Sequence, residues 1–442
     1  MKLLGMVGLL LLAQAAAAAR LVAGPMAGPP DLRSVGLWLQ ADGATRARIE
    51  AWPVDRPLKK QQVEARLQAD TQFSAVLRLT NLEPGTRYAY RVLLDGRPAG
   101  DIQQFSTQPL WQWRREAPDF TLLAGSCAYG NEAAYDRPGP PYGGRHEIFD
   151  RMAGEGPDLT LWLGDNIYFR EVDYGSAEGM AHRWAYERRQ PYLQRLLHTG
   201  AHAAIWDDHD YGPNDANASF VLKGEALKLQ QRYWANPSYG LPGTPGAFTQ
   251  FGFNDVDIFL LDNRWYRDSD RLPDPAGRRM FGDAQMRWLK NALLASTARF
   301  KLVVGGSQML FKSGHGDSWA DFLAEQKDFL DFLEVTRVPG VLFISGDVHR
   351  AELQKLERPG RYPLHELTCS ALTSGVYVNE SLRDRPQLVS GTLVMGERNF
   401  CKLRFEGGRA ERRLQLQVIT ADGETKWTKV LSAAELGAAL PP

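Results

Sequence analysis

Three apolar segments of this sequence run directly into acidic residues, and this repeated arrangement constrains the fold more than any other feature. The segments with their acids cover residues 159–165, 203–208 and 341–347. None of them carries a charge before its first acid. Short uncharged runs of this kind are typical of strands that are buried on both faces of a sheet. We therefore expect parallel strands whose ends present acidic loops along one rim of a sheet.

The loops after these strands contain side chains that bind metal ions. Residues 205–215 hold four acids and a histidine without any Lys or Arg. In the other two loops a Gly precedes Asp165 and Asp347, and Gly permits close approach of the backbone. One such loop alone is usually a surface turn. Three acidic loops, together with a fourth strand-like segment that ends near Cys127, predict a rim that holds metal ions.

Length and charge limit the classes of protein. The 442 residues are enough for two or three domains. The sequence has 52 basic and 52 acidic residues, so its formal net charge is zero. This balance argues against a surface that binds nucleic acid or anionic membrane through bulk charge. We expect a monomer with no nucleic-acid-binding surface.

The first residues have the pattern of a signal peptide. Lys2 precedes an apolar run at residues 3–12, and small residues follow at 15–19. We expect residues 1–19 to be removed by cleavage after Ala19. The apolar run is too short to favour a permanent transmembrane helix. The protein is therefore expected in the periplasm or outside the cell, without a stable membrane anchor, and the alternative is an uncleaved anchor.

The remaining chain divides into two domains by its pattern of polar and apolar residues. Residues 20–112 contain short alternating runs with turn residues between them, which predicts an all-β sandwich that resembles a fibronectin type III domain. Residues 119–442 alternate strand-like and helical patterns, which predicts an α/β domain. We expect helices over residues 181–199, 224–233, 283–296 and 319–334.

The chain has three cysteines. If Cys127 binds a metal, Cys369 and Cys401 remain, and both lie in strand-like stretches. An oxidising compartment would permit a disulfide between them. Two buried free thiols are an equally acceptable alternative.

Five motifs of the chain occur in the order found in alkaline phosphatase D-like (PhoD-like) enzymes. They are Ser126-Cys127 and residues 164–168 (Gly-Asp-Asn-Ile-Tyr), 206–210 (Trp-Asp-Asp-His-Asp), 261–264 (Leu-Asp-Asn-Arg) and 345–349 (Ser-Gly-Asp-Val-His). The resemblance extends from about residue 24 to about residue 431 and implies a calcineurin-like metallophosphoesterase. Such enzymes have a two-sheet sandwich flanked by helices, here preceded by the β-sandwich. Secreted members of the family usually carry a twin-arginine signal, which this chain lacks.

The resemblance also implies two metal sites that share Asp165 as a bridging carboxylate. The first site would hold Fe³⁺ through Cys127, Asp165, Tyr168 and His349. The second would hold Ca²⁺ through Asp165, Asp208 and Asp347, and its oxygen ligands suit Mn²⁺, Mg²⁺ or Zn²⁺ almost as well. Taken alone, Tyr168 is more often a packed aromatic residue than a ligand, and Cys127 more often a small core residue.

Three further residues are candidates for catalysis. We expect His209 to act as a general acid or phosphate stabiliser, oriented and kept protonated by Asp210 and its acidic neighbours. Arg264 could bind phosphate oxygens, and the alternative is a salt bridge to Asp262 or Asp268. Gln308 lies near the position where many relatives place a ligand histidine, and His315 lies in a Gly-rich loop that could line the pocket.

The predicted function is hydrolysis of phosphate monoesters, diesters or both, by in-line attack of a metal-bound hydroxide on a small-molecule substrate. The first alternative is a phospholipase D-like phosphodiesterase. An alternative from another class is a non-catalytic binding protein of the cell envelope, with the β-sandwich as its binding module.

Overall fold

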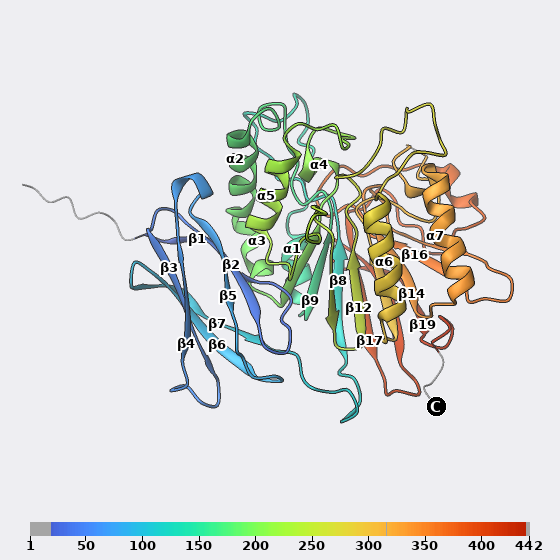
Figure 1. Ribbon diagram of the computed structural model, residues 1–442. Coiled ribbons are helices and arrows are strands. Elements are labelled where there is room, and N and C mark those ends of the chain that lie inside the picture. The colour runs from blue at the N-terminus through green and yellow to red at the C-terminus, as the bar shows by residue number, and fades with distance from the viewer. Residues whose placement is uncertain (1–18, 315, 439–442) are drawn as a thin grey trace, which may run out of the picture.

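The computed structural model describes residues 19–314 and 316–438 (Figure 1). The predicted signal peptide, apart from Ala19, and His315 lie outside the described residues. Within the described ranges, no helix has the length and apolar character needed to cross a membrane.

The N-terminal domain is all-β, as predicted. It packs three strands against a separate four-stranded sheet, and Leu37, Ile49 and Tyr90 are among the buried residues between them. The three strands are β1 (Leu21–Ala27), β2 (Val35–Ala41) and β5 (Ser74–Leu79), and the four are β4 (Gln61–Arg66), β3 (Arg46–Pro53), β6 (Arg87–Leu94) and β7 (Arg97–Ser106). A short 3-10 helix, η1 (Ala69–Thr71), precedes β5.

The N-terminal domain is joined to the next domain by its strands as well as by the chain. Strand β1 pairs in parallel with β10 (Ala201–Ile205), so β1, β2 and β5 extend the larger sheet of the second domain. Trp38 of β2 is fully buried at this boundary, with its ring 5.7 Å from that of Tyr233. The guanidinium of Arg78 donates to the carbonyl of Asn236. Domain orientation is thus fixed by backbone pairing and by packing.

The second domain is an α/β sandwich of two mixed sheets, which confirms the predicted fold class. The larger sheet has nine strands, in the order β19-β18-β17-β8-β9-β10-β1-β2-β5, and the smaller has six, in the order β11-β12-β13-β14-β16-β15. The strands not yet defined are β8 (Phe120–Gly125), β9 (Leu159–Leu163), β11 (Thr249–Phe253), β12 (Val256–Leu260), β13 (Phe300–Val304), β14 (Val341–Ser345), β15 (Glu352–Leu356), β16 (Leu364–Thr368), β17 (Asn399–Glu406), β18 (Arg413–Thr420) and β19 (Thr425–Ser432).

Helices cover the outer faces of both sheets (Figure 1). Near the larger sheet lie α1 (Ile148–Gly154), α2 (Ala177–Arg188), α3 (Pro191–Leu197), α4 (Asp208–Tyr211) and α5 (Lys223–Tyr233). Against the smaller sheet lie α6 (Asp283–Ala295) and α7 (Leu323–Thr336), whose Leu289 and Phe329 pack in one cluster with Phe343 of β14. The 3-10 helices of this domain are η2 (Trp319–Asp321) and η3 (Glu380–Asp384).

The helix predicted over residues 181–199 is in fact two helices. Helix α2 ends at Arg188, and α3 begins with Pro191 as its first residue. Proline has no backbone N–H to donate and disfavours helical conformation in the residue before it, so it begins a new helix rather than continuing the old one. The apolar spacing of this stretch runs across the break, which is why the pattern alone predicted one helix.

The disulfide alternative left open by the sequence is the one found. Cys369, just after β16, is bonded to Cys401 of β17, with Cα atoms 5.7 Å apart. The bond therefore links a strand of the smaller sheet to a strand of the larger one. Cys127 is a buried free thiol.

Parallel strands bring the predicted loops to one rim. Strands β8, β9 and β10 are adjacent and parallel, so Cys127, Asp165 and Asp208 follow neighbouring strand ends. Strand β14 of the facing sheet delivers Asp347. The sheets meet closely here, because a Cβ added to Gly346 would lie 2.4 Å from Oγ of Ser126. A side chain at this position would push the two sheets apart.

Candidate metal centre

Four of the six predicted ligand positions share an unusual backbone conformation. The φ angles are 62° at Cys127, 51° at Asp165, 71° at Asp347 and 51° at His349. Residues with a side chain rarely adopt positive φ, and each such position costs about 1–3 kcal/mol. Strain of this kind concentrates at functional sites, where the surrounding structure holds it in place. The four strained residues therefore mark one site, and all four come from the predicted loops.

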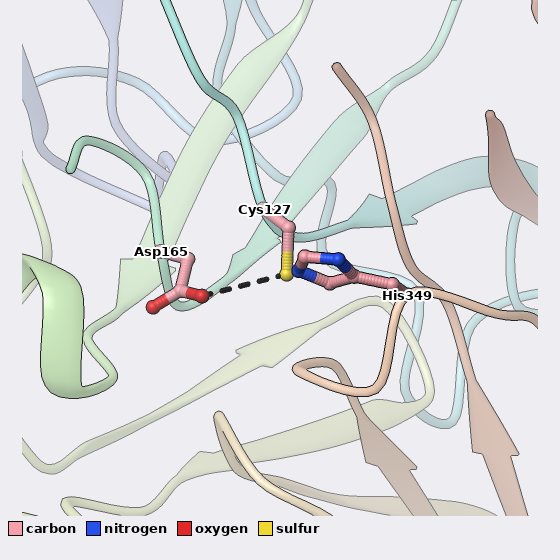
Figure 2. A group of neighbouring side chains, drawn as sticks. All are labelled: Cys127, Asp165 and His349. Carbon is pink, nitrogen blue, oxygen red and sulfur yellow. Dashed lines mark hydrogen bonds between the residues drawn. The ribbon is translucent and has the colours of Figure 1, made fainter. Parts of the chain in front are cut away.

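The residues predicted to bind iron lie together. The sulfur of Cys127 is 3.5 Å from a carboxylate oxygen of Asp165 and lies between that carboxylate and the His349 ring (Figure 2). The ligand atoms of these three residues are within 4.8 Å of one another. The hydroxyl of Tyr168 donates to the same Asp165 oxygen at 3.0 Å and lies 3.5 Å from Nε2 of His349. All four predicted side chains thus face one point.

Asp165 also belongs to a second group of donor atoms. Asp165, Asp208 and His209 offer ligand atoms within 4.8 Å of one another. Asp347, which the sequence placed with Asp165 and Asp208, forms a third group with two other acids. Only Asp165 occurs in two of the three groups found in the described part of the chain. It is therefore placed where one carboxylate reaches two groups of donor atoms.

The acids of the third group are Asp207 and Asp317, and neither was assigned a role from the sequence. Asp207 precedes helix α4 and caps it, while Asp317 comes from the loop before η2. A signal for Asp207 was present, because it lies inside the acidic loop. Asp317 stands alone in a Gly-rich stretch, and only the folded chain brings it to the rim.

Burial and mutual repulsion make this cluster unfavourable without a cation. Burial raises the pKa of Asp165 well above its usual range, and the charges of Asp208 and Asp207 raise it further. Burial, then Asp317 and Asp207, raise the pKa of Asp347 in the same way. The pKa of the Cys127 thiol is also raised, by burial and by Asp165. Like charges so close together in a buried place are stabilised by bound cations.

Arg264 is held by acids rather than exposed to a ligand. Its guanidinium is fully buried, 2.5 Å from Asp207 and 2.7 Å from Asp317. The hydroxyl of Ser307 accepts a further hydrogen bond from it. Of the two interpretations of Arg264, the geometry favours the salt bridge, although the acids are Asp207 and Asp317 and not its sequence neighbours. Its position fixes two carboxylates of the rim.

The carboxylate of Asp210 is bonded to backbone amides and not, within the described residues, to the ring of His209, which it was expected to orient. Its carboxylate accepts hydrogen bonds from the backbone amides of Asn166, Ile167 and Asp207 at 2.8, 3.3 and 3.0 Å. These bonds tie the loop after β9 to the start of α4. Asp210 is therefore a residue that positions the two acidic loops, and within the described residues its side chain has no bond to His209.

His209 faces the open side of the site. Its side chain is 21% exposed, and its ring lies 4.2 Å from the Tyr168 ring. Burial lowers the pKa of His209, and the nearby charge of Asp208 opposes this effect without reversing it. The expectation that acidic neighbours keep the ring protonated is therefore not supported in the metal-free chain.

Gln308 and Arg350 form a support beneath the loop of Asp347. Gln308 is fully buried and donates to Glu352 at 2.8 Å and to Thr368 at 2.9 Å, so its amide is engaged away from the rim. Arg350 pairs with Glu352 at 3.1 Å and lines the cavity above the donor groups. Arg350 was not singled out from the sequence, although it directly follows the motif that ends at His349.

The donor atoms form two adjacent sets, and each set suits a different kind of metal ion. A thiolate, a phenolate, an imidazole and a carboxylate around one point suit a strongly polarising cation, whereas the carboxylates beside them suit a hard divalent ion. The cavity over these donors has a volume of about 680 Å³ and is lined by Asp165, Asp208, Asp347 and His349 among others. The centre is therefore open to a molecule much larger than an ion.

A two-sheet α/β sandwich with paired donor groups at one rim defines a metallophosphoesterase. The chain matches the model of the PhoD-like phosphatase family over residues 122–417, and it belongs to that family. Residues 18–110 match a separate domain of unknown function, DUF7800. The family assignment agrees with the resemblance carried by the five sequence motifs.

Individual relatives agree with this assignment. Alkaline phosphatase D of Bacillus subtilis (strain 168) is 26% identical over 320 residues, which are 61% of this chain and 52% of the relative. The chain thus spans about half the length of that curated relative. A solved structure of PhoD has a TM-score of 0.75 at 19% identity and covers 94% of this chain and 91% of its own.

A second solved structure extends the fold likeness to plants. Purple acid phosphatase PPD1 from yellow lupin (Lupinus luteus) has a TM-score of 0.66 at 11% identity, with 94% of this chain and 74% of its own covered. Both solved structures resemble this chain in fold, and the 94% of the chain that each one covers includes part of the N-terminal β-domain.

Proposed function

We propose that this protein is a metal-dependent phosphoesterase that hydrolyses phosphate monoesters and diesters. The observation that carries the proposal is the shared position of Asp165 in two groups of donor atoms. When bound, two cations at such a site polarise the phosphoryl group and lower the pKa of a water molecule. The family assignment supports the same reaction class.

The residues of the chain would hold the two cations as follows. Cys127, Asp165, Tyr168 and His349 form the site proposed for Fe³⁺, and Asp165 with Asp208 and the nearby Asp347 forms the site proposed for Ca²⁺ or another hard divalent ion. The Tyr142 hydroxyl lies 3.4 Å from Nδ1 of His349, while Nε2 lies 3.3 Å from the Ser374 hydroxyl and 3.5 Å from the Tyr168 hydroxyl. Nε2 is therefore the ring nitrogen on the side of the proposed ligand Tyr168, and the contact with Tyr142 holds the other nitrogen.

Other side chains would bind and orient the substrate. Arg350 lines the cavity, whereas Arg264 is fully buried between Asp207 and Asp317, so Arg350 is better placed than Arg264 to bind phosphoryl oxygens. His209, from the motif at residues 206–210, lines the same cavity. It can donate a proton or a hydrogen bond to the leaving oxygen. Asp207 and Asp317, fixed by Arg264, keep the rim rigid.

The size of the site favours diesters as well as monoesters. The cavity over the donors adjoins a second one of about 540 Å³, and both are lined by His209 and Tyr377. A diester needs room for two substituents around the phosphorus. The phospholipase D-like alternative is thus one case of the proposed diesterase activity, in which the diester is a phospholipid.

We also propose that the protein works in the periplasm or outside the cell. The bond between Cys369 and Cys401 supports this location, since disulfides persist in oxidising compartments.

The test of the proposed function combines metal analysis with turnover. Protein purified with its metals is expected to contain about two metal ions per chain and to hydrolyse both p-nitrophenyl phosphate and bis(p-nitrophenyl) phosphate. Removal of the metals with a chelator is expected to abolish both activities, and their return should restore them. Fully metal-loaded protein that hydrolyses neither ester would refute the proposal.

The identity of the first cation predicts a colour. Tyrosinate and thiolate bound to Fe³⁺ absorb visible light through ligand-to-metal charge transfer, so protein as purified is expected to be coloured. Tyr168→Phe should change or remove the main absorption band, and Cys127→Ser should shift it and weaken iron retention. Asp208→Ala is the matched control, since it should lower activity but keep most of the colour. Colourless, active protein with zinc or manganese at both sites would contradict the iron assignment alone.

A further inference from the structure

A second cavity opens from the metal centre on the side of His209. It has a volume of about 540 Å³, and it shares His209, Tyr142, Asn214 and Tyr377 with the cavity over the donors. We call it the aromatic cavity, and its remaining lining is Tyr129, Asp136, Arg137, Pro138, Pro140, Tyr168, Phe169, Arg170, Glu171, Tyr174 and Pro213. Because His209 faces the leaving oxygen in the proposed reaction, this cavity lies where a leaving group would extend.

The walls of the aromatic cavity are rings held in fixed positions. The Tyr129 ring lies 5.0 Å from the rings of both Tyr142 and Tyr168. Its hydroxyl donates to Asp136 at 2.8 Å, and the guanidinium of Arg170 lies 4.0 Å from its centroid. Rings fixed in this way offer flat apolar surface at little entropic cost to a bound ring.

One cation of the lining is free of partners. Arg170 is not free, since it pairs with Asp136 at 2.9 Å and donates to the carbonyl of Gly130 at 2.6 Å. Arg137, in contrast, is exposed and has no hydrogen bond or ion pair within the part of the chain that the structure describes. A guanidinium in a cavity without a carboxylate partner is suited to bind an anion from a ligand.

Arg137 lies in the same cavity as His209. Both residues line the aromatic cavity, and Arg137 is the exposed cation of its lining. Glu171 is the other exposed charged residue of the lining. Arg137 is therefore the lining residue that can pair with a negative charge on a leaving group beside His209.

We propose that the aromatic cavity is a leaving-group subsite for phosphate esters whose leaving group carries both a planar ring and a second negative charge. The rings of the cavity pack against the ring of the substrate, and Arg137 pairs with the second charge. This inference rests on the proposed phosphoesterase function and names its substrate class. Phosphate esters of a nucleotide that keeps a second phosphate have both features, nucleoside monophosphates have only the ring, and simple alkyl phosphates have neither.

The test compares three monoesters that all release inorganic phosphate. They are m-carboxyphenyl phosphate, with ring and charge, phenyl phosphate, with the ring only, and trifluoroethyl phosphate, with neither. For each variant kcat/KM is divided by the wild-type value for the same ester, so that differences in intrinsic reactivity cancel. Metal content is measured for every variant.

Arg137→Met is expected to lower kcat/KM about 10- to 100-fold for m-carboxyphenyl phosphate, the range for loss of a charged hydrogen bond, and to leave the other two esters nearly unchanged. Tyr174→Leu, which keeps apolar bulk, should lower kcat/KM about fivefold for both ring-bearing esters and not for trifluoroethyl phosphate. Arg145→Met is the matched control, because Arg145 is exposed on the same loop and pairs with Asp422 outside the cavity.

Each outcome decides between the inference and its alternatives. An equal loss on all three esters with Arg137→Met would show that Arg137 binds the reacting phosphoryl group, and this result would overturn the subsite. No loss on any ester would overturn it as well. If metal-loaded wild-type protein hydrolyses none of the three esters, the proposed function fails, whereas turnover without the expected selectivity refutes only the subsite.

Discussion

Asp165→Asn is expected to abolish hydrolysis of phosphate esters and to lower bound metal at both sites. Asp165 is the residue common to two donor groups, and an amide lacks the negative charge that two cations share. Loss of the cations removes several kcal/mol of transition-state stabilisation, so turnover should fall by more than about three orders of magnitude. The measurements are the metal-to-protein ratio and kcat with p-nitrophenyl phosphate.

A second measurement separates loss of metal from loss of fold. Asp165 is crowded by Asp208, Asp207 and Asp347 in a buried place. Removing one of these charges relieves repulsion, so metal-free Asp165→Asn protein is expected to unfold at a higher temperature than metal-free wild type. Asp150→Asn, on the surface of α1, is the matched control and should change neither metal content nor turnover. A variant at Asp165 that keeps both metals and full turnover would contradict the bridging role.

The rim of the site could be predicted from the sequence because its strands are buried on both faces. Such strands must be apolar throughout, so the first acids after them stand out in the sequence. Parallel pairing then brings the ends of β8, β9 and β10 together without further information. This is why the sequence alone predicts Cys127, Asp165 and Asp208 as members of one site.

The roles of the charged residues around the rim could not be predicted in the same way. Arg264 follows an apolar run and an acid. This sequence context is compatible with a residue that binds phosphate and equally with one that forms a salt bridge. Only the fold shows that Asp207 and Asp317 occupy its guanidinium. Asp317 is 110 residues from Asp207 in the numbering and has no local pattern to mark it. Contacts of this kind depend on tertiary packing, which periodicity does not describe.

The N-terminal domain shows a similar limit. Alternating runs predicted an all-β domain, and the structure confirms it. The pairing of β1 with β10 was not predicted. It consists of a single bridge between Ala27 and Ala201, and such a bridge requires no recognisable sequence pattern in either strand. The β-domain is therefore joined through β10 to the sheet of the candidate metal centre, because the end of β10 leads into Asp207 and Asp208.

His209→Ala is expected to keep both metals and to lower turnover by roughly two to four orders of magnitude, the usual range for removing an acid catalyst. His209 lines both cavities, and its side chain is the least buried member of the second donor group. A protonated ring in this position can supply a proton to the leaving oxygen, and because burial lowers the pKa of His209 this contribution should weaken as the pH rises. Substrates with poor leaving groups depend most on that proton.

The loss should therefore differ between esters. Alkyl phosphates, whose alkoxide must be protonated, are expected to show the full loss, and p-nitrophenyl phosphate a much smaller one, since p-nitrophenolate leaves without a proton. His182→Ala is the matched control, because His182 is exposed on α2 and lines neither cavity. If alkyl and nitrophenyl esters lose activity equally while metal content is unchanged, His209 stabilises the phosphoryl group instead of protonating the leaving oxygen. If metal content falls instead, His209 is itself a metal ligand. That outcome would agree with its place beside Asp165 and Asp208 in one donor group.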